Sequence, residues 1–179
     1  MTEENRTAIL DAVDALFLPH PGADLLLDAV AEHAGTTVQT VLRHFGSKGG
    51  LLEAAARRGL EKVKTGRDQV PSGDLPAVAA YLGRHYEESG AMVLRMLSVE
   101  DKMPQVAKIA QHGRDMHRAW VERVLAPLIG PLAGRERRRR VAVLVAVTDV
   151  LTWKVLRLEQ GLSQRDYQHS VLDLLEAVR

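Results

Sequence analysis

The sequence contains no cysteine, few aromatic residues and no long hydrophobic run. Without cysteine the chain has no disulfide, no thiol nucleophile and no thiolate ligand for zinc or iron–sulfur clusters, which fits a reducing compartment. No window approaches the ~20 apolar residues that a membrane helix needs, and the acidic first residues differ from the basic start of a signal peptide. We therefore expect a cytoplasmic protein that has no membrane contact.

An excess of charge of one sign is also missing, because 24 Lys and Arg residues face 23 Asp and Glu residues. A balanced chain has no overall basic character, so any binding of nucleic acid must come from a local arrangement of side chains. The length of 179 residues, with 46% hydrophobic residues, suits one globular domain or a domain with a small appended module. Composition excludes a disordered or fibrous chain and leaves the function open.

Apolar residues recur at helical spacing along nearly the whole chain, whereas the alternating pattern typical of strands is missing. The sequence therefore predicts an all-α fold of about nine helices. In the first helix Ile9, Val13, Leu16 and Phe17 share one stripe. The other helices are expected from Asp24 to the stop at Ala34-Gly35 and over residues 37–44, 48–67, 74–88, 90–102, 104–126, 135–160 and 163–178.

Helix caps and a change in helix length divide the chain. Thr37 is expected to cap the third helix, and Ser163 with Asp166 resembles a capping box that starts the last helix. Helices are short up to residue 47 and lengthen afterwards. We expect the chain to divide into a region of short helices over 1–47 and a region of longer helices over 48–179.

The two short helices that meet at Ala34-Gly35-Thr36, with the first helix behind them, have the spacing of a helix-turn-helix. A helix of about two turns can enter the major groove, which is ~12 Å wide. Thr37, Gln39, Thr40 and Arg43 would offer polar groups to bases or phosphates, and Val38 could contact a thymine methyl. Arg43, His44 and Lys48 gather positive charge at one end of this helix.

A series of short motifs between Arg6 and Ala56 has a recognisable order. They are Ile9-Leu10, Leu16-Phe17, Val30-Ala31-Glu32-His33-Ala34-Gly35, Thr40, Arg43-His44-Phe45, Ser47-Lys48 and Leu51-Leu52. In this order they resemble the TetR family of bacterial transcriptional repressors. The resemblance implies that 1–47 is a helix-turn-helix DNA-binding domain and that 48–179 is a ligand-sensing and dimerisation domain. Residues 37–44 would then form the recognition helix, and Lys48 would contact a phosphate.

Several positions depart from that family's usual pattern: Leu25, Leu26, Asp28, Gln39 and Leu42. Up to Lys48, acidic residues also outnumber Lys and Arg. Few cations imply modest affinity for DNA or a mild dependence on salt. The alternative function is therefore a helical dimeric module that binds a small molecule or a protein and carries a degenerate head.

The last two predicted helices are the most apolar of the chain, and we expect them to form a homodimer interface. The middle helices supply candidate residues for binding an unidentified small-molecule effector. These candidates are Met92, Arg95, Met96, Met103, His112, Met116, Trp120 and Trp153. No catalytic constellation, metal-ligand set or cofactor motif is recognisable, so we predict that the protein is not an enzyme and has no cofactor.

Two consecutive glycines, Gly49 and Gly50, open the helix that follows the predicted head. Each Gly costs about 0.5–1 kcal/mol relative to Ala inside a helix. One hypothesis is that they form a hinge that lets the heads change their separation. The other is that they permit a close approach of the backbone to a phosphate at the helix N-terminus.

Overall fold

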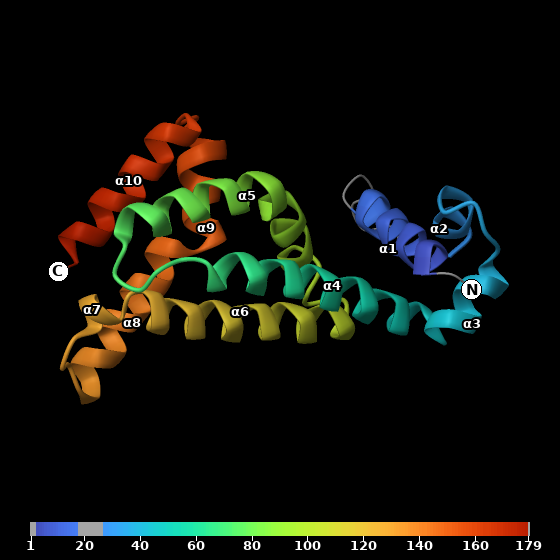
Figure 1. Ribbon diagram of the computed structural model, residues 1–179, viewed down its shortest axis with the longest axis horizontal. Helices are drawn as coiled ribbons and strands as arrows, with labels where there is room; N and C mark the ends of the chain where they lie inside the picture. Colours follow the sequence, from blue (N-terminus) through green and yellow to red (C-terminus); the bar gives the residue numbers. More distant parts are fainter. Residues whose placement is uncertain (1–2, 18–26, 179) are drawn as a thin grey trace. The chain divides into compact units, whose positions relative to one another are not determined.

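The computed structural model describes residues 3–17 and 27–178, and this part of the chain is almost entirely helical (Figure 1). The all-α prediction is therefore confirmed. The helices are α1 (Glu3–Phe17), α2 (Leu27–His33), α3 (Val38–Phe45), α4 (Lys48–Asp68), α5 (Leu75–Leu97), α6 (Pro104–Val124), α7 (Ala126–Ile129), α8 (Gly134–Thr148), α9 (Val150–Trp153), the π-helical segment η1 (Lys154–Glu159) and α10 (Gln164–Ala177).

The chain forms two compact units that share three long helices. The first unit is Met1–Lys62 with Arg95–Ala110, and the second is Val63–Leu94 with Gln111–Arg179. Helices α4, α5 and α6 each contribute to both units. No single cut in the sequence separates the units, and the predicted division into 1–47 and 48–179 stays a prediction.

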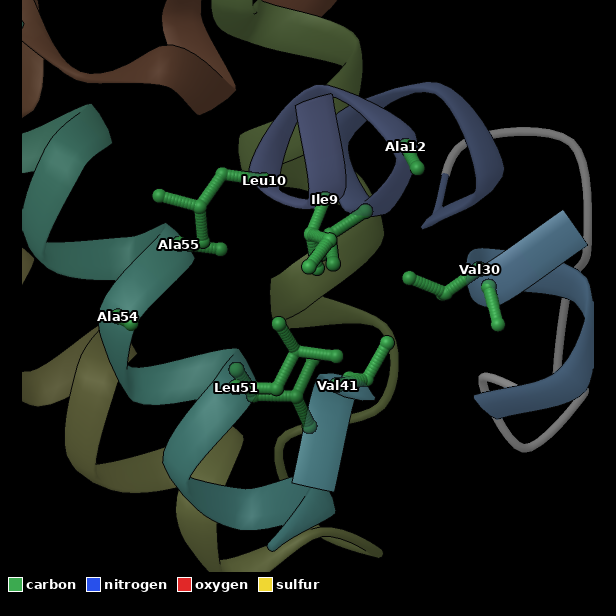
Figure 2. Packing of buried hydrophobic residues seen from close by; sticks show 11 residues of the cluster. Ile9, Leu10, Ala12, Val30, Val41, Leu51, Ala54 and Ala55 are labelled. Atoms are coloured by element: carbon green, nitrogen blue, oxygen red, sulfur yellow. The ribbon is translucent and has the colours of Figure 1, made fainter. Parts of the chain in front are cut away.

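The first unit is held together by a cluster of small and branched aliphatic side chains. Figure 2 shows Ile9 of α1, Val41 of α3 and Leu51 of α4 pointing toward one another, each fully buried. Val30 of α2 is also fully buried. Burying such a side chain contributes about 1.5–3 kcal/mol, so these four contacts fix the three short helices on α4.

The predicted caps are present. The Thr37 side chain accepts a hydrogen bond from the Thr40 amide at 3.2 Å, and Ser163 accepts one from the Asp166 amide at 3.1 Å. Between α2 and α3, Gly35 has a φ of 63°, a left-handed conformation that only glycine adopts without strain. The sequence therefore predicted both the helix-turn-helix turn and the start of the last helix correctly.

The predicted break at Gly90 is wrong, because α5 runs without interruption from Leu75 to Leu97. A Cβ atom at Gly90 would lie 2.6 Å from the Trp153 ring, well inside the contact distance. This glycine allows a bulky ring to approach the helix. Its cost to helix stability, about 1 kcal/mol, is too small to end a helix that is packed on a core.

The continuous helix predicted over 135–160 is also wrong, because it is interrupted at Asp149. The Asp149 carboxylate accepts a hydrogen bond from the Leu151 amide at 2.8 Å and so caps the new helix α9. The helix predicted over 104–126 ends at Val124 and is followed by the separate turn α7. The predicted cap Asp24 and the departures at Leu25 and Leu26 lie outside the described residues.

Within the described residues, no helix combines the length and the apolar character needed to cross a lipid bilayer.

Candidate nucleic-acid interface

Helix α3 is anchored on one side and exposed on the other. Val41 is fully buried, and Val38 and Phe45 are half-buried against the same aliphatic cluster. These three positions follow the spacing of one helical stripe. The Val38 side chain, predicted to contact a thymine methyl, thus faces the core of the first unit with most of its surface.

The opposite side of α3 presents a compact polar group. Thr37, Gln39 and Arg43 are exposed, and Thr40 is half-buried. The Thr37 and Thr40 hydroxyl oxygens lie 3.0 Å apart in a hydrogen bond, which orders the N-terminal end of this surface. Leu42, with 37% of its side chain exposed, lies beside them and replaces Val38 as the apolar side chain that faces outward.

The two remaining predicted DNA contacts differ in character. His44 is half-buried, and its Nε2 atom is buried without a hydrogen-bond partner among the described residues. Partial burial of the ring and then the charges of Arg43 and Arg6 lower the pKa of His44, so the ring is neutral at physiological pH. Lys48 opens α4 and is half-buried. The positive charge near α3 therefore comes from Arg43, Lys48 and Arg6.

The acidic surplus of the head is partly neutralised by a residue that the sequence analysis did not consider. Arg58 on α4 places its two terminal nitrogens 2.7 Å from carboxylate oxygens of Asp11 and Asp14 on α1. Arg6 lies over the Phe45 ring, 5.1 Å from its centroid. Arg58 thus offsets part of the negative charge of α1 and lessens its effect on the α3 surface.

The tight joint between α3 and α4 explains one of the two adjacent glycines. The Gly50 amide donates a hydrogen bond to the Ser47 hydroxyl at 3.0 Å, and a Cβ atom at Gly50 would lie 2.1 Å from the Phe45 carbonyl oxygen. At Gly49 the nearest atom would be 3.7 Å away, an ordinary contact. The close approach at Gly50 is therefore to the protein's own backbone.

The predicted effector-binding residues are divided between the units. Arg95, Met96 and Met103 belong to the first unit, and Met103 packs against its aliphatic cluster. The others, Met92, His112, Met116, Trp120 and Trp153, belong to the second unit. There His112 is exposed, whereas Trp120 and Trp153 are almost completely buried. An effector site built from these eight residues stays a prediction.

The second unit contains a buried polar cluster that the sequence analysis missed. Arg67 and His117 are 7% and 6% exposed, and Thr148 is fully buried. Arg67 Nη2 lies 3.0 Å from His117 Nδ1, and His117 Nε2 lies 3.0 Å from the Thr148 hydroxyl. A guanidinium only donates, so Nδ1 accepts and the imidazole proton is on Nε2. The Thr148 hydroxyl in turn donates to the Leu144 carbonyl at 2.8 Å.

Burial and a neighbouring charge keep both His117 and the nearby His85 neutral. Desolvation, followed by the charge of Arg67, lowers the pKa of His117 to about 3 and that of His85 to about 4.

Two signals in the sequence could have located the cluster of Arg67, His117 and Thr148. Arg67 continues the α4 stripe of Leu60 and Val63, and His117 shares an α6 face with Val121 and Val124. A charged or titratable residue on an apolar stripe indicates burial.

Comparison with known proteins supports the interpretation of the first unit. Residues 9–55 match the family model for bacterial regulatory proteins of the tetR family. This segment contains α2, α3 and the turn between them, together with most of α1 and the start of α4. A comparison with curated protein sequences gave no match.

Solved structures share the fold over nearly the full chain. A transcriptional regulator from Rhodococcus sp. Rha1 is similar with a TM-score of 0.72 and 21% identity, over 98% of this chain and 94% of the other. A putative TetR-family transcriptional regulator from Rhodococcus sp. has a TM-score of 0.69 and 18% identity, over 98% of both chains. A TetR transcription regulator from Haloarcula marismortui ATCC 43049 has a TM-score of 0.66 and 16% identity, also over 98% of both chains.

The helix-turn-helix and the family model that matches it make the first unit similar to the DNA-binding part of bacterial transcriptional regulators. Over residues 9–55 the N-terminal part of the chain is similar to bacterial regulatory proteins of the tetR family. Regulators of this family are generally DNA-binding proteins without enzymatic activity, and they typically form dimers.

Proposed function

We propose that this protein is a ligand-responsive repressor that binds a palindromic operator as a homodimer in the cytoplasm. The observation that carries the proposal is the exposed polar face of α3. Gln39 and Arg43 are exposed on a helix whose opposite side is fixed in the core by Val41. A rigid helix with base-reading side chains on its free face is what direct readout in the major groove requires.

The side chains of this face divide into two roles. The Gln39 amide can form a bidentate pair with adenine, and the Arg43 guanidinium can do so with guanine, so both carry sequence information. Lys48 and the Thr37 hydroxyl bind phosphate oxygens and set the position of the head. Leu42 offers an apolar contact to a thymine methyl.

The first test is selection of operator DNA from a random double-stranded pool by the purified chain without added ligand. Selected sites are then titrated by fluorescence anisotropy at several salt concentrations. We expect a palindrome whose half-sites are ~34–36 Å apart, one turn of DNA, because a dimer places two α3 helices on one face of the duplex. Weak binding without an enriched sequence would contradict the proposal and favour a module with a degenerate head.

Two substitutions separate base reading from phosphate binding. Gln39→Ala should weaken the selected site about 5–150-fold and relax the preference at one position, because one base pair loses its partner. Lys48→Ala should weaken all sequences to a similar extent and lower the salt slope by about 1. Arg138→Ala removes one exposed charge from the second unit and serves as the control, which should bind as the parent does. Equal effects of both variants on every site would contradict this division of roles.

The proposed homodimer uses the outer surface of α8 to α10. Some of the apolar residues there are buried within the chain, and five large ones remain substantially exposed. These five are Val143, Leu151, Val155, Leu158 and Leu174, at 39–57% exposure. A second copy of the same surface would remove them from water in a two-fold arrangement.

The dimer is tested by adding charge to this surface. The double variant Leu151→Glu with Leu158→Glu should sediment as a monomer, because burying two carboxylates without partners is costly. It should keep its helical content. It should also bind a single half-site with the same affinity as the whole palindrome. Ala119→Glu adds an acid at an exposed position of α6 and should remain a dimer. A double variant that sediments as the parent does would place the interface elsewhere.

The ligand response is a consequence of linkage between two sites. An effector that prefers the conformer with badly spaced heads lowers operator affinity by the ratio of its affinities for the two conformers. The operator titration, repeated with saturating effector, should then show weaker binding. An operator affinity that is the same with and without bound effector would contradict a ligand-responsive function.

A further inference from the structure

The positively charged guanidinium of Arg67 is buried in the second unit without a negatively charged partner. Its side chain is 7% exposed, and no carboxylate of the described residues lies within 4 Å of its guanidinium. Its partners are the neutral His117 ring at 3.0 Å, the face of Trp120, whose ring centroid is 5.2 Å from the guanidinium carbon, and the Tyr81 hydroxyl, which forms a side-chain hydrogen bond with it. The buried Nε atom has no hydrogen-bond partner among the described residues.

The nearby polar groups cannot replace a counter-ion. His117 and His85 are neutral bases, and burial raises the pKa of Tyr81 and Tyr86, so their phenols keep their protons. A buried charge that lacks an opposite charge is strongly unfavourable. A core position that holds an uncompensated guanidinium is therefore suited to an anion from outside the chain.

A series of neighbouring aromatic rings begins at the Arg67 guanidinium. Trp120 lies 5.5 Å from Tyr81 between ring centroids, Tyr81 stacks on His85 at 5.4 Å with an 11° interplanar angle, and His85 lies 5.0 Å from Tyr86. The His117 ring is 5.8 Å from that of Trp120. The guanidinium thus lies at one end of a flat-sided apolar environment.

We propose that Arg67 is the anchor of the effector site and binds the carboxylate of a monoanionic effector whose flat apolar body lies against Trp120 and Tyr81. This inference rests on the proposed ligand-responsive function and names the chemical class of its ligand. The free Arg67 Nε hydrogen and the buried Trp120 Nε1 hydrogen, which also lacks a partner among the described residues, are the two donors available to the carboxylate oxygens.

The charges around the cluster favour a monoanion over a phosphate dianion. Arg123 donates a hydrogen bond to the Arg67 backbone carbonyl at 2.8 Å, but its own charge is shared with Asp68 at 3.8 Å. His117 does not gain a proton near neutral pH. One uncompensated guanidinium matches one negative charge.

The test compares acids with their neutral isosteres. The probes are benzoate, phenylacetate and indole-3-acetate, each paired with its primary amide, at one pH and one ionic strength. Binding is followed by fluorescence in the variant Trp153→Phe, which leaves Trp120 as the sole tryptophan, and by calorimetry on the parent chain. We expect at least one acid to bind about tenfold or more tightly than its amide, because only the acid forms a charge-assisted pair with Arg67.

Three variants decide whether Arg67 is responsible. Arg67→Met should abolish the preference for the acid, and Arg67→Lys should retain part of it. Arg165→Met removes an exposed charge from α10 and should preserve the parent's preference. A parent chain that binds none of the three acids more tightly than its amide, or an Arg67→Met variant that keeps the preference, overturns the proposal.

The stability of the ligand-free chain supplies a second readout. Met fills a similar volume without a buried charge, so Arg67→Met should raise the urea midpoint of the second unit, followed by tryptophan fluorescence. A lower midpoint would show that Arg67 is a structural residue and would overturn the proposal. Neither assay contains DNA, so failure of the operator selection alone would leave the carboxylate site standing, and the reverse also holds.

Discussion

The cores of the two units differ in the types of side chain that they bury. In the first unit the fully buried side chains are aliphatic, from Ile9 and Val30 to Leu51. In the second unit the core includes the guanidinium of Arg67 and the ring of His117. Its buried aromatic residues are Tyr81, Tyr86, Trp120, Trp153 and Tyr167.

This difference shows where each unit keeps its polar chemistry. The core of the first unit is aliphatic, and the hydrogen-bonding side chains of Thr37, Gln39 and Arg43 are exposed on the outer face of α3. The second unit buries hydrogen-bonding groups and leaves some of them without partners, which costs stability unless a ligand completes them. The two units thus differ in where their polar side chains lie, which is what we expect if the first unit binds DNA on its surface and the second binds a ligand in its interior.

The largest loss of stability is expected from truncating a side chain in the aliphatic core of the first unit. Leu51→Ala should destabilise the first unit by about 2–5 kcal/mol, because Leu51 is fully buried and its loss leaves a cavity. Both tryptophans, Trp120 and Trp153, belong to the second unit, so their fluorescence reports only on that unit. We expect the urea transition followed by circular dichroism to shift more than the one followed by fluorescence. Equal shifts would show that the two cores unfold as one.

The next effect separates the two adjacent glycines. Gly50→Ala should cost about 1–3 kcal/mol, because the added methyl group collides with the Phe45 carbonyl oxygen. Gly49→Ala, its matched control, should stabilise α4 by about 0.5–1 kcal/mol through helix propensity. Urea unfolding and operator affinity are measured for both variants. Losses of operator affinity that are similar in both, without a change in stability, would instead support a hinge.

The smallest effect at a single pH is expected from the buried histidine. The pKa of His117 is about 3 in the folded chain and near its ordinary value of 6.5 when unfolded, so between these values the unfolded chain binds more protons. Stability therefore falls as the pH is lowered through this window. His117→Gln should reduce that loss by about 1 kcal/mol at pH 6, since Gln also accepts from Arg67 and donates to Thr148 without titrating.

Urea unfolding from pH 7 to 5, followed by tryptophan fluorescence, measures this effect. The other titratable residues near His117, which are His85, Tyr81 and Tyr86, are not substituted in this variant. His169→Gln replaces an exposed histidine on α10 and should retain the parent's pH dependence. An unchanged pH dependence in His117→Gln would mean that His117 is not held neutral by its surroundings.

Local signals in the sequence were sufficient for the head. The Thr37 cap, the left-handed Gly35 and the stripe that leads to Val41 act within one or two helical turns. Such interactions are set by near neighbours, so α3 was predicted within a residue at each end. The error at Gly90 arose because a partner distant in the sequence, the Trp153 ring, packs against that glycine. The break at Asp149 is a local cap that the sequence analysis did not identify.

The sequence by itself determined the all-α fold, the helix-turn-helix and the polar face of α3, because helical periodicity and capping are local properties. Only the tertiary structure placed Arg58 against Asp11 and Asp14, and only it brought Arg67 to His117 and Trp120 from separate helices. Whether a charged side chain ends in water, in an ion pair or in a core depends on which helices pack around it, and that packing is a property of the whole chain.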